Sequence, residues 1–298
     1  TALTTGLPNH HFWISLSANG RTLAVSDYPY FGVQQLYIAT RGDTGWSDPV
    51  AIGSGSWPSL SADGRRLAYV SGIDVAFVER DGDGWTTPEV LTSNPAFGAR
   101  VEYPQMTRDG LAITYWLVED GVQDLYLLRW GDEGWRSPQK ITPSPVLHAT
   151  STAGPTAADR AATRIIYTRP VTYTDFTGVS VGASHLDLAE WNGTDWQVRH
   201  LVEASGFANF NTWPHLSPDG LTLVFDAWMR RDGPLEVYDA LWQMETSNAP
   251  VDPLLPTTTT ATIPPSGDTV YSPVDTTVYE IPTGTFTTTV VLTHTIEP

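Results

Sequence analysis

A short hairpin pattern returns five times along this chain of 298 residues. Each copy has a first apolar strand, a tight turn and a second strand in which apolar and polar residues alternate. The turn residues of the five copies are spaced by 44, 46, 50 and 60 residues, and they are Asn19, Asp63, Asp109, Asp159 and Asp219. A repeat of about 40–50 residues is typical of β-propellers, in which each four-stranded unit buries its apolar face against the next. The sequence therefore predicts an all-β chain with a five-bladed propeller at residues 1–246.

The second copy shows how one blade is built. Pro58–Ser61 forms its innermost strand, and Asp63-Gly64 makes a tight turn because Asp bonds its own backbone and Gly tolerates a positive φ. Residues 65–71 and 74–79 read as the next two strands, and a turn and an outer strand follow. One Trp recurs after the turn between the third and fourth strands, and we interpret this Trp as a packing residue in each copy: Trp46, Trp85, Trp135 and Trp196.

The fifth copy has no outer strand of its own. After Leu235–Gln243 the chain turns into a Pro/Thr-rich stretch. Residues Ala2–Thr5 resemble the outer strand at Val90–Ser93, so we expect the N-terminal strand to complete the last blade. Closing the ring in this way removes the exposed strand edges that promote aggregation.

The pattern aromatic-Pro-x-Leu-Ser-x-Asp-Gly, as in WPSLSADG from Trp57 and WPHLSPDG from Trp213, resembles the TolB-type propeller repeat. The resemblance covers residues 1 to about 246 and implies a β-propeller. Proteins of this type serve as binding platforms, as parts of peptidases and as surface-protein modules. The fourth copy departs from the pattern, because Arg160 follows Asp159 where the other copies have Gly, and this leaves its strand register open.

The C-terminal part has a different composition. Residues 247–266 are rich in Pro and Thr without periodicity, as in a stiff linker. Residues 267–298 alternate like strands and resemble the opening strands of the β-sandwich domain of ankyrins and netrin receptors. About 30 residues are too few for such a domain. We therefore expect either that the native chain continues past Pro298 or that these strands pair with another partner, including a second copy.

The composition excludes several classes of function. The formal net charge of −17 argues against binding to nucleic acid, which needs clustered Lys and Arg. The chain has no cysteine, which excludes disulfides, thiolate catalysis and Cys-ligated zinc. No apolar run reaches the ~18 residues of a membrane span. Together with the Thr/Pro tract, these features favour a secreted or cell-surface bacterial protein.

The first candidate binding residues are aromatic and lie six positions before the turn residue in four of the five copies: Trp13, Trp57, Tyr103 and Trp213. At the mouth of a propeller channel such rings stack on a sugar or attract an ammonium group. The alternative interpretation is that they wedge between neighbouring blades.

A second set lies in the connections between the second and third strands. The set combines aromatic, acidic and Arg residues, which are typical of binding surfaces: Asp27, Tyr28, Tyr30, Trp116, Glu119, Arg169, Tyr173, Asp175, Asp226, Trp228 and Arg230. The alternative is that these loops only cover the blade ends. Asp27, Glu102 and Asp226 come from similar strand ends of different blades, so they also fit the three channel carboxylates of a glycosidase.

The sequence predicts no metal site and no cofactor. The histidines His10, His11, His148, His185 and His215 show none of the spacings of zinc ligands. We expect a non-enzymatic extracellular module that binds a glycan or protein ligand or serves for structural display. Two alternatives stay open: a glycoside hydrolase that uses the channel carboxylates, and a surface or filament subunit that self-associates through residues 267–298.

Overall fold

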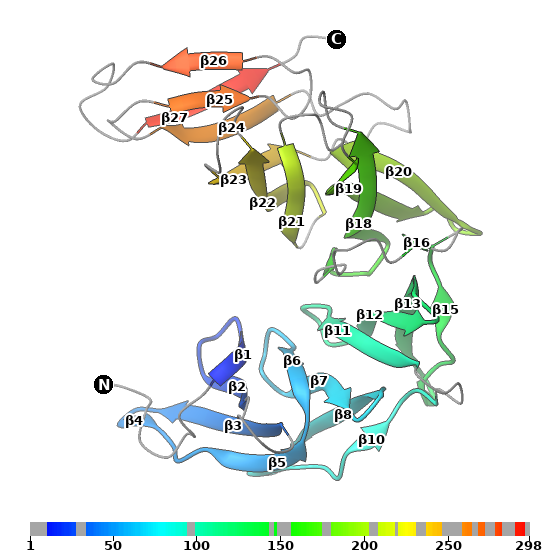
Figure 1. Cartoon of the computed structure of the whole chain (residues 1–298). Coiled ribbons are helices and arrows are strands. Elements are labelled where there is room, and N and C mark those ends of the chain that lie inside the picture. Colours follow the sequence, from blue (N-terminus) through cyan, green and yellow to red (C-terminus); the bar gives the residue numbers. More distant parts are fainter. Residues whose placement is uncertain are drawn as a thin grey trace. The chain divides into compact units, whose positions relative to one another are not determined.

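The computed structural model describes residues 11–27, 34–93, 99–142, 146–147, 156–174, 180–202, 208–217, 220–230, 237–245, 258–263, 268–271, 278–281 and 290–295. Within these residues every regular element is a strand, and there is no helix that could cross a membrane (Figure 1). The chain forms two compact units. Unit 1 comprises Thr1–Pro145 with Arg160–Ala162, and unit 2 comprises Val146–Asp159 with Thr163–Pro298.

Unit 1 holds three antiparallel sheets, one for each of the first three sequence copies. In the first sheet, β3 pairs with β2, β4 and β5; its strands are β1 (His11–Leu16), β2 (Thr22–Asp27), β3 (Gln35–Gly42), β4 (Gly45–Trp46) and β5 (Val50–Ser54). The second sheet consists of β6 (Ser56–Leu60), β7 (Arg66–Ser71), β8 (Asp74–Asp81), β9 (Gly84–Trp85) and β10 (Glu89–Val90). The third contains β11 (Arg100–Met106), β12 (Ala112–Glu119), β13 (Val122–Gly131), β14 (Gly134–Trp135) and β15 (Gln139–Lys140). This confirms the predicted order of strands within a copy.

The core of unit 1 lies between successive sheets. One cluster joins Ala24, Leu36 and Ile38 of the first sheet to Leu60, Leu67, Tyr69, Ala76 and Val78 of the second. The next cluster joins Ala68, Val70, Val75 and Phe77 of the second sheet to Val101, Met106, Ile113, Tyr115 and Leu128 of the third. Trp85 packs against the first cluster and Trp135 against the second, as expected for structural rings. The first and second copies thus each bury an apolar face against the following copy.

The Asp-Gly turns are built as predicted. The side-chain oxygen Oδ1 of Asp63 accepts hydrogen bonds from the Ser61 hydroxyl, at 2.6 Å, and from the Arg65 amide, at 3.0 Å. Asn19 and Asp109 make the same two kinds of bond in their own turns. The turn glycines Gly20, Gly64, Gly110 and Gly220 have φ between 67° and 74°, which a residue with a Cβ seldom adopts.

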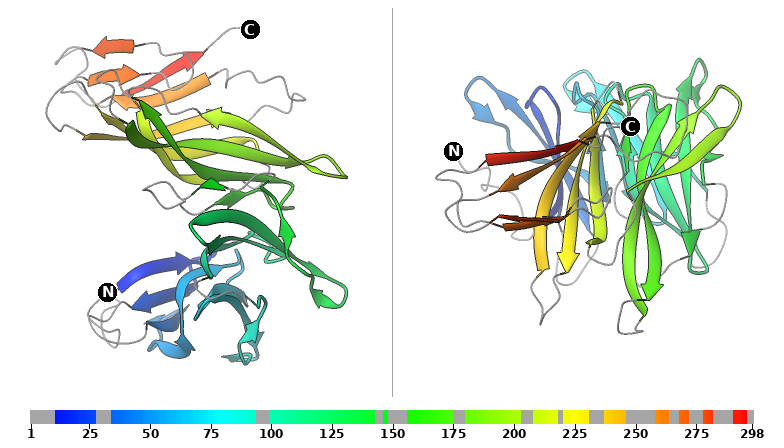
Figure 2. Two further views of the ribbon diagram at one scale, coloured as in Figure 1. Left: turned by 45° about the vertical axis from the view of Figure 1, so that its right-hand side comes forward. Right: turned by 90° about the horizontal axis from the view of Figure 1, so that it is seen from above.

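Unit 2 holds the fourth and fifth copies and the C-terminal strands. The fourth copy contains β17 (Ala157–Ala158), β18 (Arg164–Thr174), β19 (Ser180–Trp191) and β20 (Trp196–Val202), and the short strand β16 (Val146–Leu147) precedes it in the chain. The fifth contains β21 (Ala208–Leu216), β22 (Thr222–Arg230) and β23 (Val237–Glu245). A single parallel residue pair, Ser184 with Phe210, joins β19 to β21. The strands within each sheet are twisted, as the further views show (Figure 2).

The turn of the fourth copy lacks the Gly, and additional side-chain hydrogen bonds hold this turn instead. Both carboxylate oxygens of Asp159 accept hydrogen bonds from Thr163, at 2.7 Å each, and Oδ1 also accepts one from the Arg164 amide. This places Ala157 opposite Ile166 and Ala158 opposite Ile165, which settles the register of this copy.

The segment that we interpreted as a linker contains a strand. β24 (Thr258–Ile263) pairs with β23 at Gln243 and Met244, and β27 (Val290–Thr295) pairs with β24 over six residue pairs. β25 (Asp268–Tyr271) and β26 (Val278–Ile281) form a separate hairpin. The run of Thr that reads as a stiff linker is equally suited to a strand, because β-branched side chains favour extended backbone. The tail strands therefore have partners within the chain itself.

The residues predicted to close the ring, Ala2–Thr5, lie outside the described residues. The neighbour of β23 at Gln243 and Met244 is β24. Closure by the N-terminal strand and the number of blades stay predictions.

Candidate functional site

Three of the four predicted aromatic residues lie at a bulge in the innermost strands. The strand register shifts between Ser56 and Ser59 in β6, between Glu102 and Gln105 in β11, and between Thr212 and His215 in β21. In each case the bulge holds an aromatic residue followed by Pro, which has no amide hydrogen for the ladder. The aromatic residues have φ of 49° at Trp57, 49° at Tyr103 and 51° at Trp213. A bulky residue in this conformation carries a strain of about 1–3 kcal/mol, and such strain gathers at functional sites.

Three of the predicted rings meet in unit 1, one from each sheet. The ring centroids of Trp13 and Trp57 are 5.8 Å apart, those of Trp13 and Tyr103 are 5.8 Å apart, and those of Trp57 and Tyr103 are 5.1 Å apart. All three side chains are half-buried. We call these residues the aromatic cluster. Such edge-to-face and tilted contacts stabilise aromatic groups beyond simple burial and leave part of each ring accessible.

One polar atom of the aromatic cluster has no partner within the described residues. Nε1 of Trp57 is buried and makes no hydrogen bond there. Burying an amide-like N–H without a bond costs about 1–3 kcal/mol, so it is normally satisfied by water or a ligand. Nε1 of Trp135 and of Trp196 is buried in the same way, so the aromatic cluster offers ring surface and its buried N–H does not set it apart.

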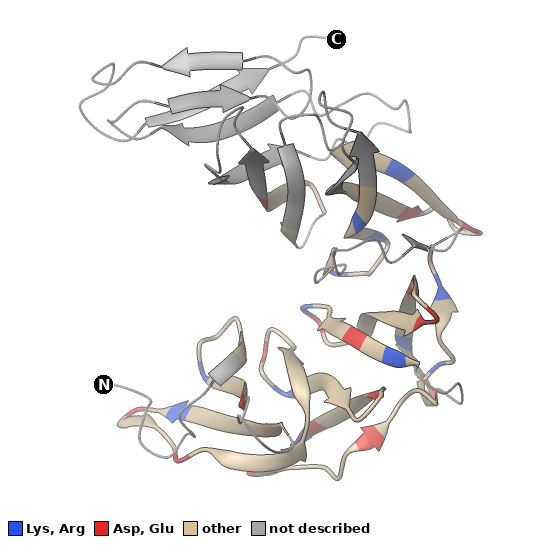
Figure 3. Ribbon diagram, in the orientation of Figure 1, with Lys and Arg blue, Asp and Glu red and all other residues tan. Residues whose placement is uncertain are grey.

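Glu102 precedes Tyr103 and is held by its neighbours. The carboxylate is 5% exposed, and its Oε1 accepts a 2.8 Å bond from Nε of Arg100. Oε2 lies 3.5 Å from Nε2 of the buried Gln123. Figure 3 shows this acidic and basic pair side by side on β11. Because side chains of the protein contact both carboxylate oxygens, Glu102 suits a structural or orienting role.

The other candidate residues divide between the two units. In unit 1, Trp116 is fully buried, so its ring is a core residue and not part of an accessible site. Asp27 is also buried, and its Oδ1 accepts the Gln35 amide at 2.7 Å. Trp213, which is 43% exposed, and Asp226, which is partly buried, belong to unit 2. Tyr28, Tyr30 and Asp175 lie outside the described residues, as do the side chains of Tyr173, Trp228 and Arg230.

The three carboxylates proposed for a glycosidase are therefore not seen as one site. Asp27 and Glu102 each accept hydrogen bonds within unit 1. The relation of Asp226 to them stays a prediction.

A second polar cluster lies in unit 2, and the sequence analysis did not find it. Asp187 on β19 is 1% exposed and accepts a 2.6 Å bond from Nε of Arg169 and a 2.7 Å bond from Nδ1 of His200. Nη2 of Arg169 lies 3.0 Å from Nδ1 of His185. Burial is the main cause that raises the pKa of Tyr167, and the Asp187 carboxylate acts in the same direction.

This cluster brings metal-ligand types together without forming an open metal site. The ligand atoms of His185, Asp187 and His200 all lie within 4.8 Å of one another. However, the guanidinium of Arg169 lies among them and contacts all three residues. A cation is therefore already supplied by the protein, and the cluster is best described as an ion-pair network.

A signal for this cluster was present in the sequence. His185 and Asp187 are two residues apart on one strand, so their side chains point to the same face. In the sheet, Arg169 pairs with His185 and Asp187 with His200. A search for polar residues at a period of two would have found the pair on β19, but not its partners on β18 and β20.

Comparison with known proteins relates the chain to other propellers by structure alone. No family model and no curated protein matches the sequence. The structure of TolB from Acinetobacter baumannii is similar with a TM-score of 0.50 and 20% identity, over 80% of this chain and 52% of that one. The chain thus spans about half the length of that TolB. A putative TolB from Agrobacterium tumefaciens matches over 98% of this chain and 92% of its own, with a TM-score of 0.53 and 15% identity.

A third similar structure comes from a peptidase. The β-propeller domain of the Trilobed protease from Pyrococcus furiosus has a TM-score of 0.51 and 10% identity, over 85% of this chain and 78% of that one. At these identities the similarity concerns the fold. The chain has the fold of a TolB-like β-propeller.

Proposed function

We propose that this protein is a binding module whose aromatic cluster, Trp13, Trp57 and Tyr103, holds a sugar ring of a glycan. The observation that carries the proposal is the convergence of these three rings from three sheets, with centroids 5.1–5.8 Å apart. Each of the three copies in unit 1 supplies one ring, and the fold of this unit brings the three rings to one place.

The local chemistry favours a neutral, hydroxyl-rich ligand. Half-buried rings present apolar faces to the C–H groups of a sugar. The formal net charge of −17 disfavours an anionic ligand. Arg100 on β11 is already paired with Glu102.

The contacts that the carboxylates of unit 1 make within the protein support binding over hydrolysis. Glycoside hydrolysis needs two carboxyl groups that flank the bond to be cleaved. In unit 1, Glu102 is paired with Arg100 and Asp27 accepts a backbone amide. We also propose, from the Thr/Pro-rich segment and the absence of cysteine, that the protein acts as a secreted or cell-surface protein, which fractionation of the source cells would test.

A glycan array with the full chain, followed by calorimetry on the best glycan, tests the proposal. Trp13→Ala and Trp57→Ala should each weaken binding about tenfold, which corresponds to about 1.4 kcal/mol of lost stacking. Trp57→Phe keeps a ring but removes the N–H, so it separates stacking from hydrogen bonding.

Trp46→Ala is the matched control, because Trp46 is also half-buried but lies on the short strand β4, away from the aromatic cluster. It should leave glycan affinity unchanged. Equal affinity of the wild type, Trp13→Ala and Trp57→Ala, or no glycan bound by the wild type, would overturn the proposal.

A further inference from the structure

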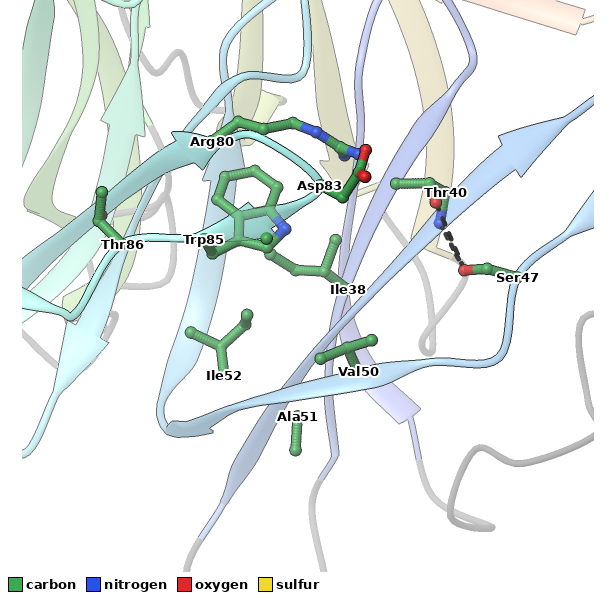
Figure 4. A pocket seen from close by; sticks show the side chains of 11 residues that line it. Ile38, Thr40, Ser47, Val50, Ala51, Ile52, Arg80, Asp83, Trp85 and Thr86 are labelled. Atoms are coloured by element: carbon green, nitrogen blue, oxygen red, sulfur yellow. Dashed lines mark hydrogen bonds between the residues drawn. The ribbon is translucent and has the colours of Figure 1, made fainter.

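Unit 1 contains a pocket away from the aromatic cluster, between the first and second sheets. Its volume is about 240 Å³, and its walls include Ile38, Val50 and Ile52 from the first sheet and Arg80, Asp83 and Trp85 from the second. Figure 4 shows the indole of Trp85 beside Ile38, with Arg80 and Asp83 on the far side of the ring from Ile52. All of these residues belong to unit 1.

The next interface of the same unit shows why this pocket exists. Ile38 lies opposite Ala24 on the neighbouring strand, and Phe77 lies opposite Ala68, so the two are equivalent positions. Likewise, Arg80 pairs with Trp85 in the second sheet as Trp130 pairs with Trp135 in the third.

In that next interface the space is filled by rings. The centroid of Phe77 is 6.0 Å from that of Trp130 and 5.2 Å from that of Trp135, and those of Trp130 and Trp135 are 5.4 Å apart. Between the first two sheets, Phe77 is replaced by Ile38 and Trp130 by Arg80. Trp85 therefore keeps its place but lacks the two rings that its counterpart contacts.

We infer that this pocket binds a planar aromatic ring from a small molecule or an exposed side chain, which takes the place of the missing rings beside Trp85. A ring there would contact the Trp85 indole as Phe77 and Trp130 contact Trp135. The aliphatic groups of Ile38, Val50 and Ile52 would cover its other surface.

Polar groups at the rim define the ligand further. The guanidinium of Arg80 suits an aromatic face, as the Cζ atom of Arg66 shows at 4.5 Å from the Trp130 ring centroid. Asp83 supplies an acceptor for a ring N–H or O–H. Figure 4 also shows that the Ser47 hydroxyl accepts a hydrogen bond from the Thr40 amide, at 3.0 Å. An indole or a phenol thus matches the pocket better than a plain hydrocarbon ring.

Calorimetry and saturation-transfer NMR with indole, phenol and N-acetyl-L-tryptophanamide test this inference on the full chain. The wild type should bind indole or phenol. Binding of the amide as well indicates a side chain of a polypeptide as the source, whereas binding of the free rings alone indicates a small molecule.

Ile38→Phe and Arg80→Trp restore the residues of the filled interface, so each should reduce binding at least tenfold while the melting temperature is kept or raised. Ile73→Phe is the matched control, because Ile73 is exposed and does not line the pocket. No binding of any ring to the wild type at millimolar concentration, or equal binding by wild type and both filled variants, would overturn the inference. Glycan binding by these variants should be unchanged, since the aromatic cluster is a separate site.

Discussion

The hydroxyl of Ser59 accepts a 2.9 Å hydrogen bond from the backbone amide of Met106, which belongs to the next sheet of unit 1. Ser15 makes the same bond to the amide of Leu60, one sheet earlier. The amides of Leu60 and Met106 lie just after the aromatic-Pro bulges, where the ladder register is shifted. The Ser of the repeat therefore links one blade to the bulge of the next.

We predict that Ser59→Ala lowers the free energy of unfolding by about 1–3 kcal/mol, because the buried Met106 amide loses its acceptor. Chemical denaturation measures the change. Ser93→Ala, at an exposed position, serves as the control and should change stability by less than about 0.5 kcal/mol. A loss at Ser59 no larger than at Ser93 would show that water replaces the hydroxyl without cost.

Asp63 should give the protein a pH-dependent contribution to stability. Partial burial raises the pKa of its carboxyl group, but the hydrogen bonds from Ser61 and the Arg65 amide and the charges of Arg65 and Arg66 together lower it below the ordinary value. A lowered pKa in the folded state stabilises the protein above the unfolded pKa of about 4, and this contribution disappears as the pH falls through the folded pKa.

Asp63→Asn tests this because Asn19 makes the same turn bonds in the first copy. The variant should fold normally at pH 7. Below a pH of about 4 the melting temperature of the wild type should fall more than that of the variant. Thermal unfolding from pH 7 to pH 2.5 measures this difference. Parallel pH profiles would show that the Asp63 charge does not contribute.

Substitutions of Gly64 and Gly72 allow the cost of backbone strain to be measured separately from the cost of a steric clash. Both have positive φ, of 70° and 65°. A Cβ at Gly64 would collide with the Thr22 side chain and come within 2.9 Å of the Ser17 Cβ, whereas one at Gly72 would meet nothing within 4 Å. We expect Gly72→Ala to cost about 1 kcal/mol from backbone strain alone, and Gly64→Ala to cost clearly more. If denaturant titrations show that both substitutions lower the free energy of unfolding equally, the first two sheets separate easily at this turn.

The repeat made the blade structure predictable because each local signal agrees with the fold. The Asp63-Gly64 turn, the alternation in β7 and the packing of Trp85 and Trp135 all follow from residue types at short range. The convergence of Trp13, Trp57 and Tyr103 was also predictable, because one position of a repeat lies in one place on each blade.

Features that depend on differences between copies were harder to predict. The sequence suggested that Trp116 belongs to a binding loop, but Trp116 lies within β12 and is fully buried. The Arg169–Asp187–His200 network needs the pairing of three strands, which no short motif reveals. The pocket beside Trp85 exists only because Ile38 and Arg80 are smaller or less planar than their counterparts. The Thr residues at 258–260, which lie in β24, show that composition alone does not separate a linker from a strand.

The last prediction concerns the outer edge of β23. β24 pairs with β23 at Gln243 and Met244, and β27 covers the other side of β24. A chain ended at residue 250 lacks both strands, so the edge of β23 loses these bonds and becomes available to other chains. We expect this shortened chain to self-associate at micromolar concentration while the full chain stays monomeric, as measured by multi-angle light scattering.

Met244→Lys in the shortened chain supplies the control, because a charge on an edge strand opposes pairing with another copy. This variant should remain monomeric. The opposite pattern, with oligomers of the full chain that disappear in the shortened one, would show that the strands after residue 257 pair between molecules. In that case the β24–β27 ladder would serve assembly, and the tail would need a second copy in order to fold. The reason is that two or three strands alone bury too little surface to offset their conformational entropy.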